Sequence, residues 1–396
     1  MPQQKQNFPK LRFPEFSGEW AEKKLGELLE FKNGINANKE QYGKGVKFIN
    51  VLDILNNDFL THDKIIGCVD VDMDMVNKYP VEYGDILFQR SSETREEVGS
   101  ATVYLDSEKK ATFGGFVIRG KKIGNYEPVF LNKLLKTDLA RDEITSKSGG
   151  STRFNVGQET LSSVVLLFPN LKEQEKIAAF LTAVDELIAK LQEKQRLLTE
   201  YKTGVMQQIF EQKIRFTDDN GKPYPAWEDN ILGEVCTISK GEQLNKSELT
   251  LAGDYPALNG GISPSGYTDV YNTYENTITI SEGGNSCGYV NYVKQKFWCG
   301  GHCYALLNLS SAVANLFLYQ VLKYKQNEIM ALRVGSGLPN IQKKDLNNFK
   351  IQMPSLKEQE KIADFLSTID AEIEAVAEQI EQAQAYKKGL LQQMFV

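Results

Sequence analysis

Cysteine and histidine side chains that lie close together are the first candidates for chemistry in this chain. Cys287 precedes the run Cys299-Gly-Gly-His-Cys303, and thiolate sulfur and imidazole nitrogen are ligands that zinc prefers. An earlier run, Phe113-Gly-Gly-Phe-Val117, resembles this one but contains no zinc ligand. The comparison favours cysteines that fill a core strand over a zinc site, and we predict no metal site.

Motifs for catalysis or cofactor binding are absent from the sequence. The chain has 2 histidines, no Walker phosphate loop and no G-x-G-x-x-G after a strand. No two prolines are adjacent, which excludes the Asn-Pro-Pro-aromatic motif of adenine methyltransferases. We therefore predict no catalytic residues and no cofactor bound by this chain.

Charge is segregated along the chain, although the net charge is -6. Residues 356–396 hold 4 basic and 8 acidic residues, so the acidic excess lies there. Residues 109–158 hold 10 basic and 4 acidic residues, and residues 283–344 hold 7 basic and 1 acidic. Two basic segments of this kind can neutralise phosphates, which makes double-stranded DNA a candidate partner.

The basic and polar residues of each segment gather around a helix expected near 127–146 or 310–332 and the Gly/Ser loop that follows it. A Gly-rich loop allows close approach of a backbone, and Lys and Arg neutralise phosphates. The basic residues of the first segment include Lys133. The candidate DNA-binding residues there are Arg119, Lys147, Ser151, Arg153 and Asn155. Those of the second segment are Lys294, Lys296, Arg333, Ser336, Asn340, Lys343 and Lys344.

A polar stretch at 88–99 follows a predicted strand and adds Arg90 and Arg95 to the candidates. Arginine can bind the O6 and N7 edge of guanine with two hydrogen bonds. Alternatively, these arginines pair with the glutamates of the same loop, Glu93, Glu96 and Glu97. The sequence leaves both interpretations open.

An internal repeat governs how these candidates are positioned. Residues 171–210 and 356–395 are equal in length, and 19 of their 40 positions are identical. Both begin with Leu-Lys-Glu-Gln-Glu-Lys-Ile-Ala. The repeat extends to the Gly/Ser loops, where Asn155 matches Asn340. The order is globular segment, long helix, globular segment, long helix.

Both repeated segments carry apolar residues at spacings of three and four, as in a coiled coil. The first seam contains Ile177, Leu181, Val184, Ile188, Leu191, Leu198, Val205 and Ile209. The second contains Ile362, Leu366, Ile369, Ile373, Val376, Ile380, Leu390 and Met394. We expect the helices, each ~60 Å long at ~1.5 Å per residue, to pair antiparallel. The alternative is two amphipathic helices on separate cores.

The globular segments read as α/β, with short strands between Gly- and Asn-rich turns. The predicted fold is therefore α+β, with two pseudo-symmetric α/β domains separated by a long antiparallel two-helix coiled coil. Its segments are 1–170, 171–210, 211–355 and 356–396. Lys213-Ile-Arg-Phe216 follows the first helix, whereas Lys10-Leu-Arg-Phe13 has no helix before it. The C-terminal helix could supply that missing neighbour, which would close the repeat into a ring.

Two motifs resemble those of type I restriction–modification DNA-specificity subunits. One is Pro169-x-Leu-Lys-Glu-Gln-Glu-Lys-Ile-Ala178, repeated at 354–363. The other is Gly84-Asp-Ile-Leu-Phe-x-Arg-Ser-Ser-Glu-Thr-x-Glu-Glu-Val-Gly99. The second globular segment has Ser281-Glu-Gly-Gly-Asn-Ser-Cys-Gly288 in place of the latter, so its half-site should differ.

The resemblance implies that segments 1–170 and 211–355 are target-recognition domains, each reading half of a bipartite site. It implies that the helices set the gap and dock two methyltransferase subunits. S-adenosylmethionine and ATP with Mg would then belong to the methyltransferase and restriction/translocase partners. The chain itself would be a non-catalytic cytoplasmic protein without a membrane partner. The alternatives are a pseudo-symmetric scaffold and a stand-alone DNA methyltransferase.

Overall fold

The computed structural model describes residues 7–335, 337 and 339–396. The chain divides into two compact units. Unit 1 comprises residues 1–191 and 379–396, and unit 2 comprises residues 192–378. Each unit therefore contains one globular segment, part of the helix α7 (Leu171–Phe210) and part of the helix α12 (Leu356–Met394).

The strands and helices of the unit 1 globular segment follow in chain order. They are β1 (Ala21–Lys24), α1 (Leu25–Leu28), β2 (Leu29–Asn33), η1 (Lys39–Gln41), β3 (Tyr42–Ile49), α2 (Val51–Asn56), η2 (His62–Lys64), β4 (Cys68–Val69), α3 (Met73–Lys78), β5 (Ile86–Gln89), β6 (Ser91–Ser92), β7 (Ala101–Val103), β8 (Thr112–Phe113), β9 (Val117–Lys122), α4 (Pro128–Leu134), α5 (Asp138–Ser146), β10 (Phe154–Asn155), α6 (Gln158–Ser162) and β11 (Val165–Phe168).

The unit 2 globular segment contains fewer elements in a matching order. They are β12 (Glu228–Ile231), α8 (Leu232–Val235), β13 (Thr237–Lys240), η3 (Lys246–Glu248), β14 (Tyr255–Leu258), β15 (Gly266–Thr268), β16 (Thr277–Ser281), β17 (Val290–Val293), β18 (Trp298–Cys299), β19 (Cys303–Leu307), α9 (Asn315–Tyr324), α10 (Gln326–Ala331), α11 (Lys343–Asn347) and β20 (Lys350–Met353).

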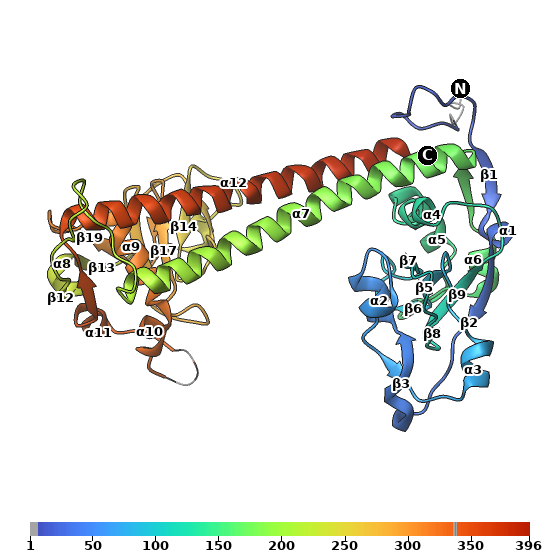
Figure 1. Ribbon diagram of the computed structural model, residues 1–396, viewed down its shortest axis with the longest axis horizontal. Helices are drawn as coiled ribbons and strands as arrows, with labels where there is room; N and C mark the ends of the chain where they lie inside the picture. The colour runs from blue at the N-terminus through green and yellow to red at the C-terminus, as the bar shows by residue number, and fades with distance from the viewer. Residues whose placement is uncertain (1–6, 336, 338) are drawn as a thin grey trace. The chain divides into compact units, whose positions relative to one another are not determined.

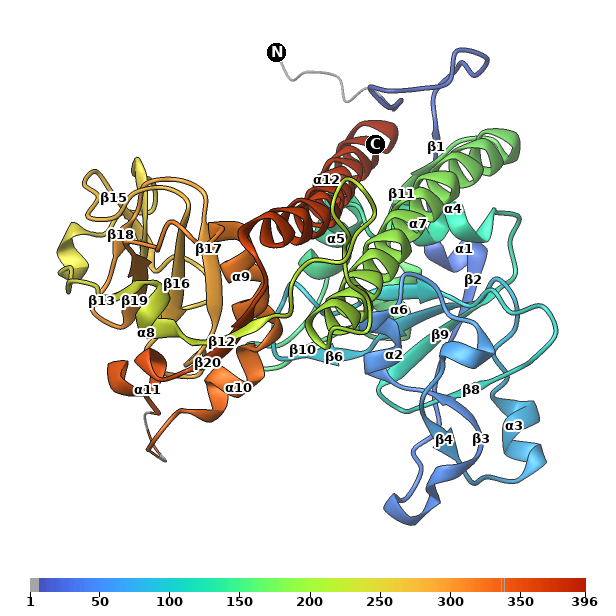
Figure 2. The same ribbon diagram turned by 60° about the vertical axis from the view of Figure 1, so that its left-hand side comes forward.

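The two units share one sheet topology. The four-stranded sheet has the order β2-β9-β5-β7 in unit 1 and β13-β19-β16-β17 in unit 2. Figure 2 shows the second of these sheets, with α9 beside it. The three-stranded sheets, β4-β3-β8 and β15-β14-β18, each combine one antiparallel and one parallel pair. The pairs β1-β11 and β12-β20 also match, so the expected pseudo-symmetric α/β units are confirmed.

The long helices pair antiparallel within each unit (Figure 1). In unit 1, Leu181 of α7 shares a core with Met394 near the end of α12. In unit 2, Ile209 near the end of α7 shares a core with Leu366 of α12. The predicted seam is therefore correct at both ends, and the alternative of helices on separate cores is wrong. No helix in the described part of the chain is both long and apolar enough to cross a membrane.

Two lysines interrupt the apolar seams, and both form ion pairs between the helices. Lys202 of α7 contacts Asp370 of α12 at 2.6 Å in unit 2. The residue that matches Lys202 in the repeat, Lys387 of α12, contacts Asp185 of α7 at 2.6 Å in unit 1. A lysine at a seam position thus finds an aspartate on the opposite helix, which fixes the register of the pair.

The N-terminal segment lies against the end of α12 in unit 1. Leu11 donates its backbone N–H to the Gln393 carbonyl at 2.9 Å. Phe13 packs edge-on against Phe180 of α7, at 5.7 Å between ring centroids. The C-terminal helix therefore supplies the neighbour that the N-terminal segment was expected to need.

Candidate nucleic-acid interface

Three loops of unit 1 meet around Arg90, directly after β5. The Arg90 backbone N–H donates to the Phe116 carbonyl at 2.9 Å, and the Val156 N–H donates to the Arg90 carbonyl at 3.0 Å. Ser91 of β6 lies opposite Asn155 of β10. We call this meeting point, residues 90–92, 114–116 and 154–156, the hub of unit 1.

Unit 2 contains the same hub at residues 282–284, 300–302 and 339–341. The Glu282 N–H donates to the His302 carbonyl at 2.9 Å, and the Ile341 N–H donates to the Glu282 carbonyl at 2.8 Å. Gly283 forms a β-bridge with Asn340. Glu282 therefore occupies the position that Arg90 has in unit 1, and His302 that of Phe116.

The two arginines of the loop at 90–99 contact backbone carbonyls. Arg90 Nη1 donates to the Gly115 carbonyl at 3.2 Å, and Arg95 Nε donates to the Thr145 carbonyl at 3.3 Å. Within the described residues, the side-chain hydrogen bonds of both arginines go to these carbonyls and not to a glutamate of the loop. Both side chains are exposed, so they keep N–H groups that can bind a ligand.

Most of the other predicted residues are exposed on or next to the hubs. In unit 1 these are Ser151, Arg153 and Asn155. In unit 2 they are Arg333, Asn340, Lys343 and Lys344. Ser336 lies outside the described residues. The repeat places Gln158 and Glu159 where unit 2 has Lys343 and Lys344, so this pair of lysines has no basic counterpart in unit 1.

The prediction that Arg119 binds DNA is contradicted by its burial, and Lys133, a basic residue of the same segment, is buried as well. Arg119 is only 5% exposed on β9, an inner strand of the four-stranded sheet, and its guanidinium donates to the Pro80 carbonyl. Lys133 is 3% exposed on α4 and is paired with Asp58 and Asp185. Neither side chain can reach a phosphate outside the fold, because its charged end is already bound within unit 1.

Three other predicted lysines are exposed in part but already have partners. Lys147 pairs with Glu143 at 2.9 Å. Lys294 pairs with Glu374 of α12 at 2.7 Å. Lys296 lies over the Tyr271 ring, 4.6 Å from its centroid. Their role in DNA binding stays a prediction.

The cysteines of unit 2 lie in the interior. Cys299 of β18 and Cys303 of β19 are 1% and 3% exposed and share a core cluster with Phe297. Burial raises the pKa of Cys287, which also lies inside the unit. Within the described residues no cluster of three or more histidine, cysteine and carboxylate side chains suits a metal ion.

The repeated Glu-Gln motif holds each globular segment to the long helices. Glu173 is fully buried and accepts two hydrogen bonds from Arg12, both at 2.8 Å. Gln174 accepts a hydrogen bond at 3.1 Å from the backbone N–H of Glu127, the residue directly before α4. Glu358 binds Arg215 and Gln359 binds the Ala314 N–H in the same way. The repeated Glu-Gln motif therefore forms buried contacts that hold the globular segment to the long helix. We call these contacts the clamp.

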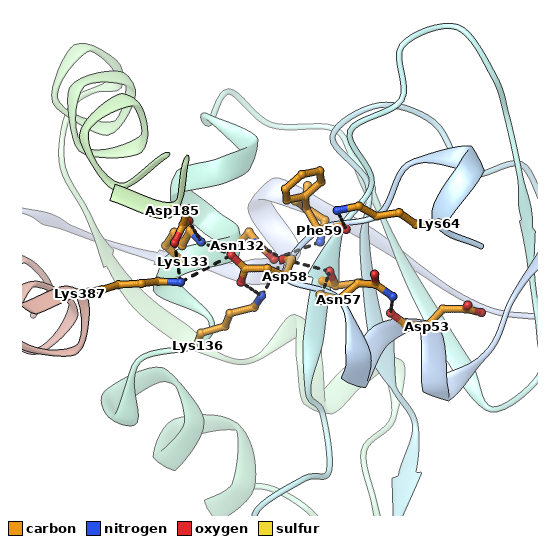
Figure 3. A network of polar contacts seen from close by, with 12 residues as sticks. Asp53, Asn57, Asp58, Phe59, Lys64, Asn132, Lys133, Lys136, Asp185 and Lys387 are labelled. Carbon is orange, nitrogen blue, oxygen red and sulfur yellow. Dashed lines mark hydrogen bonds and ion pairs between the residues drawn. The ribbon is translucent and has the colours of Figure 1, made fainter. Parts of the chain in front are cut away.

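A second clamp joins α4 of unit 1 to both long helices (Figure 3). Lys133 Nζ lies 2.6 Å from Asp185 of α7, which also binds Lys387 of α12. Asp58 binds Lys133 and Lys136 from the other side. Burial alone would raise the pKa of Asp58, but attraction to Lys136 and Lys133 lowers it. In unit 2, Gln320 of α9 donates to Asp370 at 2.7 Å, so a neutral residue fills the place of Lys133.

Comparisons with known proteins match both halves of the chain. Residues 17–199 and 225–385 match the family model described as the type I restriction modification DNA specificity domain. A relative from Mycoplasma genitalium, named as a type I specificity subunit, is 39% identical over 157 residues. That alignment covers 39% of this chain and 41% of the relative. A relative from Methanocaldococcus jannaschii, named as a type I restriction enzyme specificity subunit, is 27% identical over 98% of this chain and 95% of its own.

Solved structures support the fold. The S subunit of a type I restriction–modification system from M. genitalium superposes with a TM-score of 0.65 and 19% identity. The superposition covers 98% of this chain and 99% of that one. A chain from a structure of type I system assembly gives a TM-score of 0.52 at 18% identity, covering 94% and 96%. At these identities the likeness concerns the fold.

Proposed function

The chain belongs to the type I restriction modification DNA specificity family, and from this premise we propose that it is the DNA-recognition subunit of a type I restriction–modification complex. Each hub would read one half of a bipartite target in double-stranded DNA. One observation carries this proposal: the same three-loop hub occurs in both units, but its exposed side chains differ. Equal scaffolds with different surface chemistry suit two half-sites of different sequence.

Catalysis would belong to partner proteins. Two methyltransferase subunits would bring S-adenosylmethionine, and restriction/translocase subunits would bring ATP and Mg. This division is supported by the names of the relatives, which are specificity subunits, and by the lack of cofactor motifs in the sequence.

The first prediction tests this division of labour. We expect the purified chain, incubated with labelled S-adenosylmethionine and host-unmodified DNA, to transfer no methyl groups. Addition of the methyltransferase subunits should start transfer to one bipartite sequence. Transfer by the chain alone would favour a stand-alone methyltransferase. A gel shift that shows no DNA binding, even with the partner present, would favour a scaffold.

The second prediction concerns phosphate anchoring by α11. Because Lys343 and Lys344 are exposed next to the unit 2 hub, the double change to alanine should weaken binding to all DNA sequences about equally. The slope of log K against log salt should become shallower by roughly one unit per lost contact. Lys222→Ala, at an exposed turn before β12, is the matched control. An unchanged slope in the double variant would place these lysines away from DNA.

The long helices would set the gap between half-sites and bind the methyltransferase subunits. Their lengths, 40 and 39 residues, support the first role. Exposed aromatic side chains support the second, because Tyr201 of α7 and Tyr386 of α12 occupy equivalent repeat positions and are both more than half exposed. Large exposed aromatic residues are typical of protein interfaces.

A further inference from the structure

We propose that one pair of side chains in each hub selects the bases of its half-site, Arg90 with Phe116 in unit 1 and His302 with its supporting residue Glu282 in unit 2. The inference rests on the proposed function, since it names the residues that would perform the reading. The backbone hydrogen bonds that support each pair are the same in both units, whereas the chemistry of the two pairs is opposite.

The backbone that presents each pair is duplicated in detail. Gly99 donates to the Gln89 carbonyl at 3.0 Å, as Gly288 does to the Ser281 carbonyl at 2.9 Å. Each Gly-Gly turn is closed by an equivalent bond, from Val117 N–H to the Gly114 carbonyl at 2.9 Å and from Cys303 N–H to the Gly300 carbonyl at 3.0 Å. The hub is therefore a fixed frame on which only the side chains vary.

The Gly-Gly turns are held tightly by their neighbours. A Cβ added to Gly115 would overlap the Asn36 side chain. A Cβ added to Gly300 would lie 2.6 Å from Asn259 Oδ1, which is closer than real contacts allow. Because each turn leaves little room beside its backbone, the residue that follows it has few alternative positions before any ligand binds.

That following residue is exposed in both units. Phe116 is 64% exposed, and the His302 side chain is 63% exposed. An exposed phenylalanine next to an arginine has no role in a core, but both residue types have partners in the major groove of DNA. Arginine donates to guanine O6 and N7, and phenylalanine contacts the methyl group of thymine. Unit 1 therefore suits a base step with guanine and thymine.

The unit 2 pair has the reverse preference. Glu282 is 8% exposed and is held by Lys240 at 2.6 Å and by the Tyr304 hydroxyl at 3.2 Å. Its second oxygen lies 3.6 Å from His302 Nδ1. A carboxylate beside Nδ1 favours the tautomer with the proton there, which leaves Nε2 as an acceptor. An acceptor suits the amino group of adenine N6 or cytosine N4. Glu282 acts through His302 and is a positioning residue.

The test uses the complete complex. The chain and its methyltransferase subunits are expressed in a host without restriction–modification systems, and the methylated sequence is read by single-molecule sequencing. Phe116→Ala or Arg90→Ala should relax one position, a guanine or thymine, in one half-site only. His302→Ala should relax an adenine or cytosine in the other. Each change should reduce discrimination by about 10- to 100-fold.

Conservative changes separate reading from folding. Glu282→Gln should relax the same position as His302→Ala, whereas Glu282→Asp should restore part of the discrimination. Two control variants should keep the wild-type target. They are Ile123→Ala at an exposed site and His62→Ala at a half-exposed site, both in unit 1 and outside the hub residues.

Two results would overturn the inference. One is an unchanged target in the Phe116 and His302 variants. The other is an equal loss of methylation at all sequences in variants whose melting temperature equals that of the wild type. That result would indicate that these residues bind the DNA backbone and do not read bases. The failure of the proposed function looks different, because the wild-type complex itself would then methylate no bipartite sequence.

Discussion

Replacement of Arg12 by methionine should lower the free energy of unfolding of unit 1 by about 3–5 kcal/mol. Arg12 binds Glu173 with two hydrogen bonds at 2.8 Å, and Glu173 has no exposed surface. Loss of the arginine leaves a buried carboxylate whose charge is no longer compensated, and removal of one partner of a buried pair is strongly destabilising. The change should also release the N-terminal segment from α7.

Urea denaturation followed by Trp20 fluorescence measures this effect. Trp20 Nε1 donates to Glu173 at 3.3 Å, and the other two tryptophans, Trp227 and Trp298, belong to unit 2. Those two are replaced by phenylalanine in every variant, so that the signal reports unit 1.

Two further variants complete the experiment. Lys176→Met removes an exposed ion pair with Glu15 and should cost less than about 1 kcal/mol. The double variant Arg12→Met with Glu173→Met removes both charges and should recover most of the loss, because apolar residues of similar volume replace buried ion pairs well. An Arg12→Met variant no less stable than Lys176→Met would show that the clamp does not hold the segment.

The repeat made much of the architecture predictable from sequence. Seam residues such as Leu181 and Leu366 are buried where the three-and-four spacing places them, because a helix pair satisfies that spacing in one way. The closing contact of the N-terminal segment also followed from symmetry. The sequence could not indicate that Glu173 and Glu358 are buried and each bind an arginine, since glutamate in the first turn of a helix is ordinarily exposed.

Charge counts along the chain were a poor guide to the interface. Arg119 and Lys133 lie in a basic segment, yet one lies on an inner strand and the other on the buried side of α4. Their neighbours in the sequence indicate burial. Val117 and Ile118 precede Arg119 in a strand, and Phe130 lies one helical turn before Lys133. A lysine or arginine inside an apolar pattern is more often paired in the interior than free on the surface.

The residues at the centre of the hubs were only partly found. Arg90 is a candidate by its chemistry, whereas Phe116, Glu282 and His302 lie in stretches whose sequences alone do not indicate DNA contacts. The similarity of the two Gly-Gly runs was a usable signal, since the residue after each run is the exposed one. What the sequence could not supply was the meeting of that turn with the loop after β5, which depends on long-range sheet pairing.

The two globular segments should be interchangeable on the long helices, because both helix sites make the same contacts. Phe395 at the end of α12 packs against Trp20 and Phe130 in unit 1. Phe210 at the end of α7 packs against Trp227 and Phe317 in unit 2. The charged partners match as well, since Lys202 and Asp370 repeat the pair of Lys387 and Asp185. A copy of the unit 1 segment therefore brings Lys133 to an aspartate in either place.

We therefore expect a chain whose residues 213–355 are replaced by a second copy of residues 10–170 to fold and to bind its methyltransferase subunits. Its methylated target should contain the first half-site twice, and methylation of targets that carry the second half-site should fall by about a thousandfold or more. Methylome sequencing of a host that expresses the chimera gives the result directly. The reciprocal chimera, with residues 213–355 in both places, is the matched control and should contain the second half-site twice. If an active chimera kept the second half-site, or read a sequence unrelated to either half, the two units would not read DNA independently.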